Sequence, residues 1–384
     1  MEKLKIGFIS NISPENKKVW SGSIFRLNES FKAEGFKVIW IPIKYTKNDV
    51  LLFEKIEILY KKIFNRGFNK NHFAIKSRIA AKRIIKEIKK HDPDILFTAG
   101  GITEIAFLKT NKPIFYFNDA NQHQLLNYYD GMSGFGFLSK KATEYVEKKA
   151  LNNAAAVIFS SEWAADYAEK HYGINRKKIH INKFGANSNV SKTDRRKKRN
   201  LDEEIRFLFL GVEWKRKGGD ITVDTVRKLR ELGYPVSLYI VGCIPPYKIS
   251  DDFITVIPFL NRNIPEEAQR LEELTSSADF LFVPTRAECY GVVFCEAAAN
   301  GMPVIATDTG GISAIVENDR TGILLPLEAT AENYAEEISR LLQDPGKIRQ
   351  MSLAAKRKYE DELNWGLFGK KMKQIIENVR SKEK

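Results

Sequence analysis

The sequence predicts an α/β protein of two doubly wound domains, each a parallel sheet with helices on both faces, facing each other across a cleft. The chain has 384 residues, which is enough for two ordinary domains. Short apolar runs alternate with amphipathic stretches, which is the pattern of repeated strand–helix units. The alternation stops at a charged stretch over 191–200 and then begins again, so two successive sheets are expected.

The first half contains apolar runs rich in Ile, Val and Phe, bounded by residues that end strands. The predicted strands are Lys5–Ser10, Lys37–Pro42, Ile95–Thr98, Ile114–Phe117, Ala156–Ser160 and Ile179–Asn182. Helices are expected between them, including one over Ala74–Lys90 with isoleucines at near-helical spacing. Residues 191–200 have almost no apolar side chains and are predicted to be a linker.

The second half repeats the pattern. Its predicted strands are Arg206–Leu210, Val236–Val241, Ile254–Ile257, Phe280–Val283 and Val304–Thr307, followed by helices near 330–343, 346–359 and 364–381. The predicted domains are 1–190 and 204–363, with the helix over 364–381 as a candidate to pack back on the first domain. Because ligands of open parallel sheets bind at the carboxyl ends of strands, the chemistry is expected in the turns that follow them.

Composition narrows the class of protein. With 43% hydrophobic and 29% charged residues the chain is typical of globular proteins. No apolar run approaches the ~18 residues that a membrane-spanning helix needs, and the N-terminus has a strand pattern instead of a signal peptide. A cytoplasmic protein is therefore expected. The three cysteines lack metal-ligand spacing and are expected to be buried thiols.

The net charge of +14 is unevenly spread. Residues 1–200 contain 38 Lys+Arg and 19 Asp+Glu, whereas residues 201–384 contain 24 and 29. Such asymmetry suggests that the first half faces an anionic partner, such as a membrane surface, a diphosphate lipid or nucleic acid. The alternative interpretation is a generally Lys-rich surface.

Residues 52–64 are predicted to form a helix with one apolar face, made of Leu52, Ile56, Leu59 and Ile63. Basic residues flank and follow it: Lys61, Lys62, Arg66, Lys70, Lys76, Arg78, Lys82 and Arg83. In one interpretation the apolar face packs on its own sheet and the basic residues are solvated. In the other, the helix docks reversibly on an anionic membrane, so that the protein is peripheral at the inner face of the membrane.

The most informative segment runs from Val283 to Ala306 and contains two glutamates. A helix is expected to begin near Gly291, and a helix start offers unpaired N–H groups and a positive dipole end, which suit a diphosphate. Glu288 precedes this start and Glu296 lies one to two turns inside the helix. Because carboxylates accept hydrogen bonds from hydroxyls, one placement suits a sugar ring and the other a ribose.

A second motif, over 210–220, also follows a strand and opens a helix. Arg216 and Lys217 at that start could clamp a diphosphate, Arg as a bidentate fork and Lys as a point charge. The alternative is an ordinary basic surface turn. Two weaker signals are glycine turns after strands, Gly310-Gly311 and Trp20-Ser21-Gly22-Ser23.

Several motifs that would indicate other chemistry are missing from the sequence. It contains no phosphate-binding loop, zinc spacing, nucleophile elbow or dinucleotide fingerprint. No loop that follows a predicted strand carries an Asp-x-Asp motif, which would bridge a diphosphate through a metal. Neither a metal nor a cofactor is therefore expected.

Together these residues resemble the retaining glycosyltransferases of family 4, or group 1, which have two Rossmann-like domains in the GT-B fold. The resemblance spans nearly the whole chain and rests on Glu288-x7-Glu296, on Arg216-Lys217-Gly218 after Gly211 and on Gly310-Gly311. It implies that Arg216 and Lys217 hold a donor diphosphate, that Glu288 contacts the transferred sugar and Glu296 the ribose, and that no metal takes part. The residues implied to act in catalysis are Glu288, Arg216, Lys217 and Asp119; those implied to bind the donor are Glu296, Tyr290, Gly291, Val292, Gly22, Gly310, Gly311 and Asn118.

Two positions depart from the family pattern. Relatives often have Arg directly after the glycine that corresponds to Gly211, where this chain has Val212. Relatives also often carry a His-Asp pair after the strand over 114–117, where this chain has Asn118-Asp119. The second departure concerns the usual contact to the primary hydroxyl of the sugar, and so the identity of the donor. His123 lies nearby and is interpreted as a surface histidine.

The resemblance implies a hexosyltransferase of polysaccharide biosynthesis that uses a UDP- or GDP-sugar and a glycan or lipid-linked acceptor. In this reading the first domain binds the acceptor and the second the nucleotide sugar. A sugar-nucleotide epimerase or a phosphorylase of the same fold is one alternative, although the sequence places neither its acid/base residues nor a pyridoxal lysine. A basic protein that binds nucleic acid or other anions is another, which leaves the glutamate pair unexplained.

Overall fold

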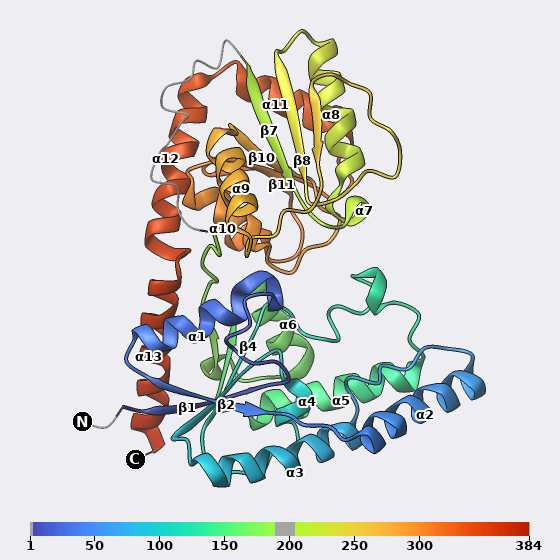
Figure 1. Cartoon of the computed structure of the whole chain (residues 1–384), viewed down its shortest axis with the longest axis vertical. Helices are drawn as coiled ribbons and strands as arrows, with labels where there is room; N and C mark the ends of the chain where they lie inside the picture. The colour runs from blue at the N-terminus through green and yellow to red at the C-terminus, as the bar shows by residue number, and fades with distance from the viewer. Residues whose placement is uncertain (1–2, 189–203, 384) are drawn as a thin grey trace. The chain divides into compact units, whose positions relative to one another are not determined.

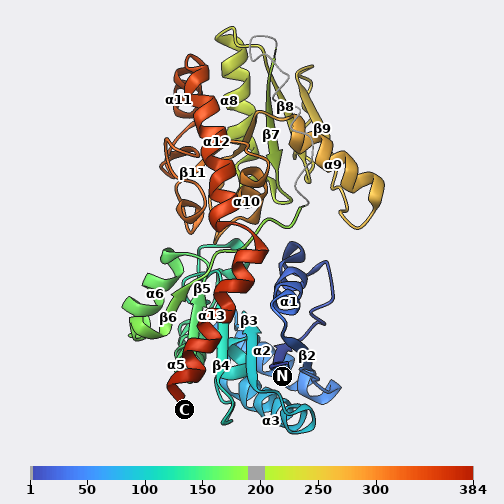
Figure 2. The same cartoon turned by 90° about the vertical axis from the view of Figure 1, so that its left-hand side faces the viewer.

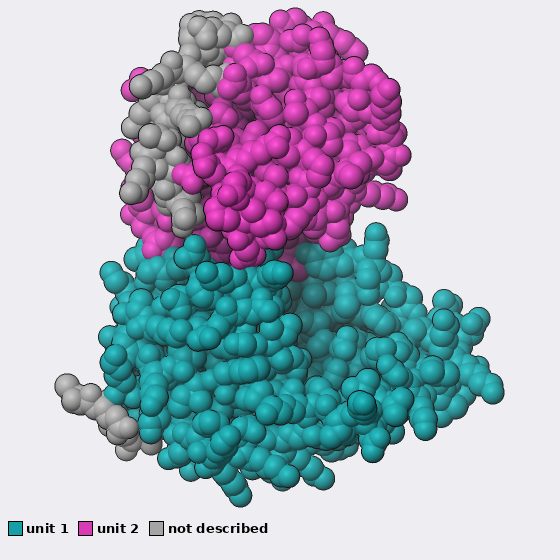
Figure 3. Space-filling model, in the orientation of Figure 1, with its two compact units in different colours: residues 1–183, 365–384 teal, residues 184–364 magenta. Residues whose placement is uncertain are grey.

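The computed structural model describes residues 3–188 and 204–383 and divides into two compact units. Unit 1 comprises Met1–Lys183 and Trp365–Lys384, and unit 2 comprises Phe184–Asn364 (Figure 3). The predicted linker over 191–200 lies outside the described residues. The last helix of the chain belongs to unit 1.

Unit 1 is built on a parallel sheet, of which β1, β2 and β4 are labelled in Figure 1. The strand order is β2-β1-β3-β4-β5-β6. The strands are β1 (Lys5–Ser10), β2 (Lys37–Pro42), β3 (Ile95–Ala99), β4 (Ile114–Asn118), β5 (Ala156–Phe159) and β6 (Ile179–Ile181). Each strand predicted in the first half is present, with ends that differ by no more than one residue. In the central register, Phe8 of β1 lies between Trp40 of β2 and Phe97 of β3.

Helices cover both faces of this sheet. They are α1 (Ser23–Ala33), α2 (Lys47–Phe64), α3 (Ala74–His91), α4 (Ile102–Ile105), α5 (Phe137–Asn153), α6 (Glu162–Tyr172) and α13 (Trp365–Glu383). Helices α1 and α13 lie on one face (Figure 2). There the ring of Phe97 packs on Phe31 of α1 with centroids 4.8 Å apart, and Phe117 packs on Phe368 of α13 with centroids 5.3 Å apart. The opposite face is buried by α3 and α5, through residues such as Ile84 and Val146.

Unit 2 has a second parallel sheet, in the order β12-β11-β10-β7-β8-β9. Its strands are β7 (Ile205–Leu210), β8 (Val236–Val241), β9 (Ile254–Ile257), β10 (Phe280–Val283), β11 (Val304–Thr307) and β12 (Gly322–Leu325). Its helices are α7 (Trp214–Lys217), α8 (Gly219–Glu231), α9 (Pro265–Ser277), α10 (Val292–Ala299), α11 (Ala331–Leu342) and α12 (Pro345–Glu362). The edge strand β12 was not predicted, because Gly-Ile-Leu-Leu is too short to show a period and begins with a strand-weakening glycine.

The strand order reverses once in each sheet. In unit 2 the reversal lies between β7 and β10, and in unit 1 between β1 and β3. Turns on the two sides of such a reversal diverge and leave a crevice at the carboxyl ends, where open α/β sheets bind ligands. Both strong sequence motifs of the second half follow strands at this reversal.

Candidate active site

Close backbone packing joins the two motifs at the reversal in unit 2. The turn between α7 and α8 contains Gly218 at φ +77°, where a Cβ atom would lie 2.1 Å from the carbonyl oxygen of Pro284. Only glycine therefore fits this left-handed, crowded position. The backbone N–H of Arg286 also donates to the carbonyl of Arg216 at 2.7 Å. The turn after β7 and the loop after β10 thus form one surface.

Lys217 and Glu288 form a buried ion pair at the centre of this surface. The Lys217 ammonium contacts the Glu288 carboxylate directly, and both residues are buried. The stem of Lys217 passes over Gly211, where a Cβ atom would lie 2.8 Å from Lys217 Cγ. The glycine that follows β7 therefore makes room for the lysine. Each of these charges balances the other, because a buried charge without a partner of opposite sign would be strongly destabilising.

Arg216 extends the same cluster. Its Nη1 lies 3.6 Å from Glu288 Oε2 and donates to the carbonyl of Ala287 at 2.9 Å. Its Nε donates to Glu213 Oε2 at 2.6 Å. This hydrogen bond lowers the pKa of Glu213. The guanidinium is therefore held in one orientation by three partners, as a preorganised electrostatic group must be.

Glu296 lies inside α10, whose N-terminus is formed by Gly291 at φ +86°. Its carboxylate is buried and receives a bidentate ion pair from Arg262, with Nη2 to Oε2 at 2.6 Å. The charge of Glu296 raises the pKa of Arg262 in return. Arg262 comes from the loop between β9 and α9, and the sequence analysis missed it. The predicted ribose contact is thus engaged with a cation from another loop.

The other predicted residues of unit 2 surround the same loop. Gly311 donates its backbone N–H to the carbonyl of Cys289 at 3.0 Å, which brings the Gly310-Gly311 turn to the loop after β10. Tyr290 is buried, and its hydroxyl donates to the carbonyl of Phe184 at 3.3 Å. The Tyr290 side chain therefore anchors the beginning of unit 2, and Val292 opens α10 next to it.

Three predicted residues belong to unit 1. The Asn118 amide is buried and donates to Tyr116 Oη at 2.9 Å and to the carbonyl of Ala120 at 2.7 Å. Its Oδ1 accepts from the backbone N–H of Asp119 at 3.0 Å. These bonds shape the loop that follows β4, with Asp119 partly exposed in it. Gly22 has φ +94° and ends a turn whose preceding residues also have positive φ.

A carboxylate that the sequence analysis did not single out holds the next part of this loop. Glu147 of α5 is buried and accepts the backbone N–H groups of Gln122 at 2.6 Å and His123 at 2.9 Å. It also accepts the hydroxyl of Tyr172 at 2.6 Å. Burial raises the pKa of Glu147 to about 7, against the three hydrogen bonds that favour its charged form.

Comparisons with known proteins agree on one family. A model of "Glycosyltransferase Family 4" matches residues 23–187, and a model of "Glycosyl transferases group 1" matches residues 204–344. A D-inositol 3-phosphate glycosyltransferase of Gordonia bronchialis is 25% identical over 242 residues, which cover 57% of this chain and 51% of that protein. An alpha-D-kanosaminyltransferase of Streptomyces kanamyceticus is 22% identical over 225 residues, covering 54% of this chain and 56% of that protein. The match thus spans only about half the length of these curated relatives.

Solved structures share the fold over nearly the whole chain. A sucrose-phosphate synthase from Thermosynechococcus elongatus is similar with a TM-score of 0.69 at 18% identity, covering 99% of this chain and 100% of that one. An Anabaena protein solved with UDP and glucose gives a TM-score of 0.64 at 14% identity, covering 97% and 99%. The predicted fold is confirmed by the two parallel sheets with their reversed strand orders. The predicted family is confirmed by the two matched models. The chain belongs to the family 4, group 1 glycosyltransferases and has their two-domain GT-B fold.

Proposed function

We propose that this protein transfers a hexose from a UDP- or GDP-sugar to a hydroxyl of a glycan or glycolipid, with retention of anomeric configuration and without a metal ion. The cluster of Arg216, Lys217 and Glu288 carries this proposal. It places two cations and one carboxylate at the strand reversal of unit 2, where such sheets bind nucleotides. The positive end of α10 lies in the same loop.

The cluster matches the charges that develop during transfer. The bond between the anomeric carbon and the diphosphate oxygen breaks, so negative charge grows on the leaving phosphate and positive charge grows on the sugar ring. Arg216 and Lys217 would stabilise the first, and Glu288 the second. The acceptor hydroxyl forms the new bond on the face that the phosphate leaves, and its proton passes to the leaving phosphate oxygen.

Donor binding is the direct test. A ligand that binds the folded protein raises its melting temperature by mass action. We expect one class among UDP-, GDP- and ADP-sugars to stabilise the full chain, and transfer to follow with that donor. An inositol phosphate belongs among the acceptors tested, because it is the acceptor in the names of several relatives. If no nucleotide sugar shifted the melting temperature and none were hydrolysed, the enzyme proposal would fail.

Glu296→Gln is expected to weaken donor binding and to change kcat much less. Hydrogen bonds to charged groups contribute about 1.5–3 kcal/mol, so KM for the donor should rise roughly 10- to 100-fold. Steady-state kinetics with varied donor measures both constants. Glu267→Gln is the matched control, because Glu267 accepts from the backbone of Asn261 in the Arg262 loop and has no predicted ribose contact. An equal rise in KM for both variants would mean that Glu296 acts only through the loop.

We further propose that unit 1 docks reversibly on anionic membrane. Of the predicted apolar face of α2, Leu52, Leu59 and Ile63 are 41%, 58% and 62% exposed, so most of this face does not pack on the sheet. Only Phe53 of this helix is buried. No helix among the described residues is long and apolar enough to cross a bilayer.

The exposed apolar side chains continue beyond α2. Gly136, at the start of α5, donates its N–H to the carbonyl of Gly67 just after α2 at 3.0 Å. Next to it, Phe137 and Leu138 are also exposed. Exposed basic residues occur on the same segments: Lys61, Lys62, Arg66 and Lys141. Apolar side chains beside basic ones are the composition of an interfacial segment.

We expect the protein to co-sediment with anionic vesicles and to leave them as salt rises. Each basic residue near such a surface contributes about 1 kcal/mol, and the Debye length falls to ~3 Å at about 1 M salt. The double variant Ile63→Asp, Phe137→Asp should lose binding, whereas Leu232→Asp, at an exposed leucine of unit 2, should keep it. Equal binding to neutral and anionic vesicles, or none at low salt, would favour a soluble acceptor.

A further inference from the structure

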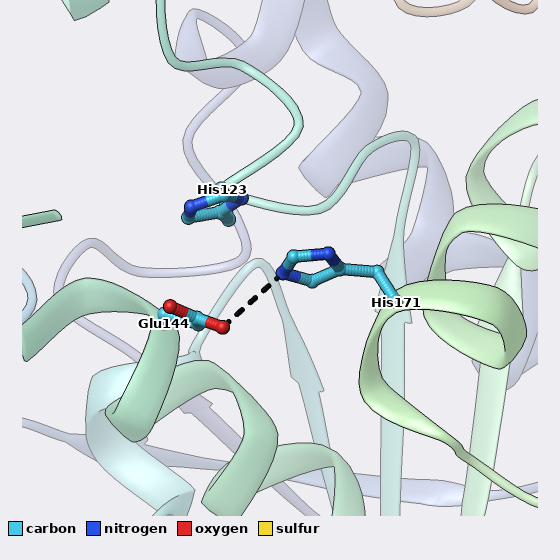
Figure 4. Close-up of side chains that lie close together, drawn as sticks. All are labelled: His123, Glu144 and His171. Atoms are coloured by element: carbon cyan, nitrogen blue, oxygen red, sulfur yellow. Dashed lines mark ion pairs between the residues drawn. The ribbon is translucent and has the colours of Figure 1, made fainter. Parts of the chain in front are cut away.

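Three side chains of unit 1 lie close together although they come from three elements. His123 lies in the loop after β4, Glu144 on α5 and His171 near the end of α6 (Figure 4). One ligand atom of each lies within 4.8 Å of the other two. We propose that His123, Glu144 and His171 form a zinc-binding site.

The donor set suits this ion. Imidazole and carboxylate groups bind Zn²⁺ at about 2.0–2.2 Å, so neighbouring ligand atoms of a tetrahedral ion lie roughly 3.3 Å apart. His171 Nε2 and Glu144 Oε1 are already 3.4 Å apart. The ring of His123 stacks on that of His171, with centroids 4.7 Å apart. The ligand atom of His123 lies within 4.8 Å of those of Glu144 and His171, so a small movement of its ring would complete the set, and the exposed His171 leaves an entry path from solvent.

Neighbouring groups hold the three ligands in the way that outer-shell partners do in metal sites. His123 Nδ1 lies 2.6 Å from the Tyr167 hydroxyl, and this partner leaves Nε2 for the ion. Lys141 binds Glu144 Oε2 at 2.8 Å, so the other oxygen faces His171. Glu147, one turn along α5, fixes the backbone of His123. His123 and Glu144 therefore each have a positioning contact, and His171 lies next to the Glu144 oxygen that Lys141 leaves unoccupied.

A second His–Glu pair in the same unit offers a matched control. His91 Nε2 lies 3.5 Å from Glu87 Oε2 on α3, a separation close to that of His171 and Glu144. Among the described residues this pair has no third metal-ligating side chain near enough to share an ion. If both pairs were only ion pairs, substitution of either histidine would have the same effect on zinc binding. If His171 and Glu144 belong to a zinc site, only substitution there should weaken zinc binding.

A bound ion would tie the loop after β4 to α5 and α6. This loop begins with Asn118 and Asp119, and Glu147 is its present anchor. The ion is placed to stabilise this part of unit 1 and takes no part in the proposed transfer chemistry. Zinc binding can therefore be measured without any donor, and its result does not depend on the proposed function.

Isothermal titration of the metal-free full chain with Zn²⁺ tests the site. We expect one Zn²⁺ per chain, and a loss of affinity of about 100-fold or more in both His171→Ala and Glu144→Gln. Tyr167→Phe, which removes only an outer partner, should lose roughly tenfold. His91→Ala should bind as the wild type does. Zinc should raise the melting temperature of the wild type and of His91→Ala, and should not raise that of His171→Ala.

Several results would overturn the assignment. One is the absence of stoichiometric zinc uptake by the wild type. Another is wild-type affinity in both His171→Ala and Glu144→Gln, which would place bound zinc elsewhere. The assignment would also be wrong if His91→Ala lost as much zinc affinity as His171→Ala. It would be wrong too if the wild type bound Mg²⁺ as tightly as Zn²⁺. Glu144→Gln keeps the size of the side chain, so it remains informative if His171→Ala fails to fold.

Discussion

Glu288→Gln is expected to lower turnover by about 100-fold or more while the fold survives. The size of the effect is that of removing one preorganised electrostatic group from a transition state. Glutamine keeps the shape of the side chain and removes only the charge that would balance the sugar ring. Single-turnover rates with saturating donor measure the loss, because they separate the chemical step from binding.

The ion pairs of Glu288 lead to a second expectation for the same variant, which concerns nucleotide affinity. This affinity should rise, although turnover falls. Glu288 is the buried partner of Lys217 and lies 3.6 Å from Arg216. Its neutralisation leaves the buried Lys217 without its anion, although Arg216 keeps its pair with Glu213, and this destabilises the free protein by a few kcal/mol. A nucleoside diphosphate can then supply the missing charge. UDP or GDP should therefore bind more tightly to the variant than to the wild type, although turnover falls.

Glu317→Gln is the matched control for this variant. Glu317 pairs with the buried Lys358 elsewhere in unit 2, so its neutralisation also leaves a buried lysine without its anion. We expect Glu317→Gln to lower the melting temperature and to leave turnover and nucleotide affinity unchanged. Equal losses of turnover in the two variants would mean that Glu288 matters only for stability.

The strands could be predicted closely because each is a short apolar run with clear ends. Val236–Val241, Phe280–Val283 and Val304–Thr307 have the predicted bounds. The helix over Pro265–Ser277 was not assigned, although proline at its first position and two glutamates in its first turn are helix-start signals. The alternation of apolar and amphipathic segments predicts where strands and helices lie in the sequence. It does not predict the order in which the strands pair in a sheet.

The candidate site shows the same limit. The motifs identified Lys217 and Glu288 separately, as groups for a diphosphate and for a sugar. Their direct pairing depends on the adjacency of β7 and β10, which are far apart in the sequence. Arg262 carries no signal of its own, because it is one arginine in a polar loop. His123, Glu144 and His171 have no metal-ligand spacing, and only the packing of α5 and α6 brings them together.

Lys217→Ala is expected to lower the transfer rate by roughly 100-fold or more, since one preorganised cation commonly contributes several kcal/mol to a transition state. Unlike Glu288→Gln, it should also weaken nucleotide binding, because it removes a cation and leaves Glu288 to repel the diphosphate. Measurement of kcat/KM for the donor and of nucleotide affinity separates the two variants. The two substitutions should therefore move nucleotide affinity in opposite directions.

The neighbouring lysine provides the control for Lys217→Ala. Lys215 lies on the same turn of α7 with its side chain exposed, so Lys215→Ala changes the net charge equally and should keep the wild-type rate. A metal at the donor diphosphate is the competing explanation. His171→Ala, which removes the proposed zinc site, allows a clean test with chelator. If chelator abolished transfer in that variant while Lys217→Ala kept the wild-type rate, a donor-bound metal would be meeting the phosphate charge in place of the lysine.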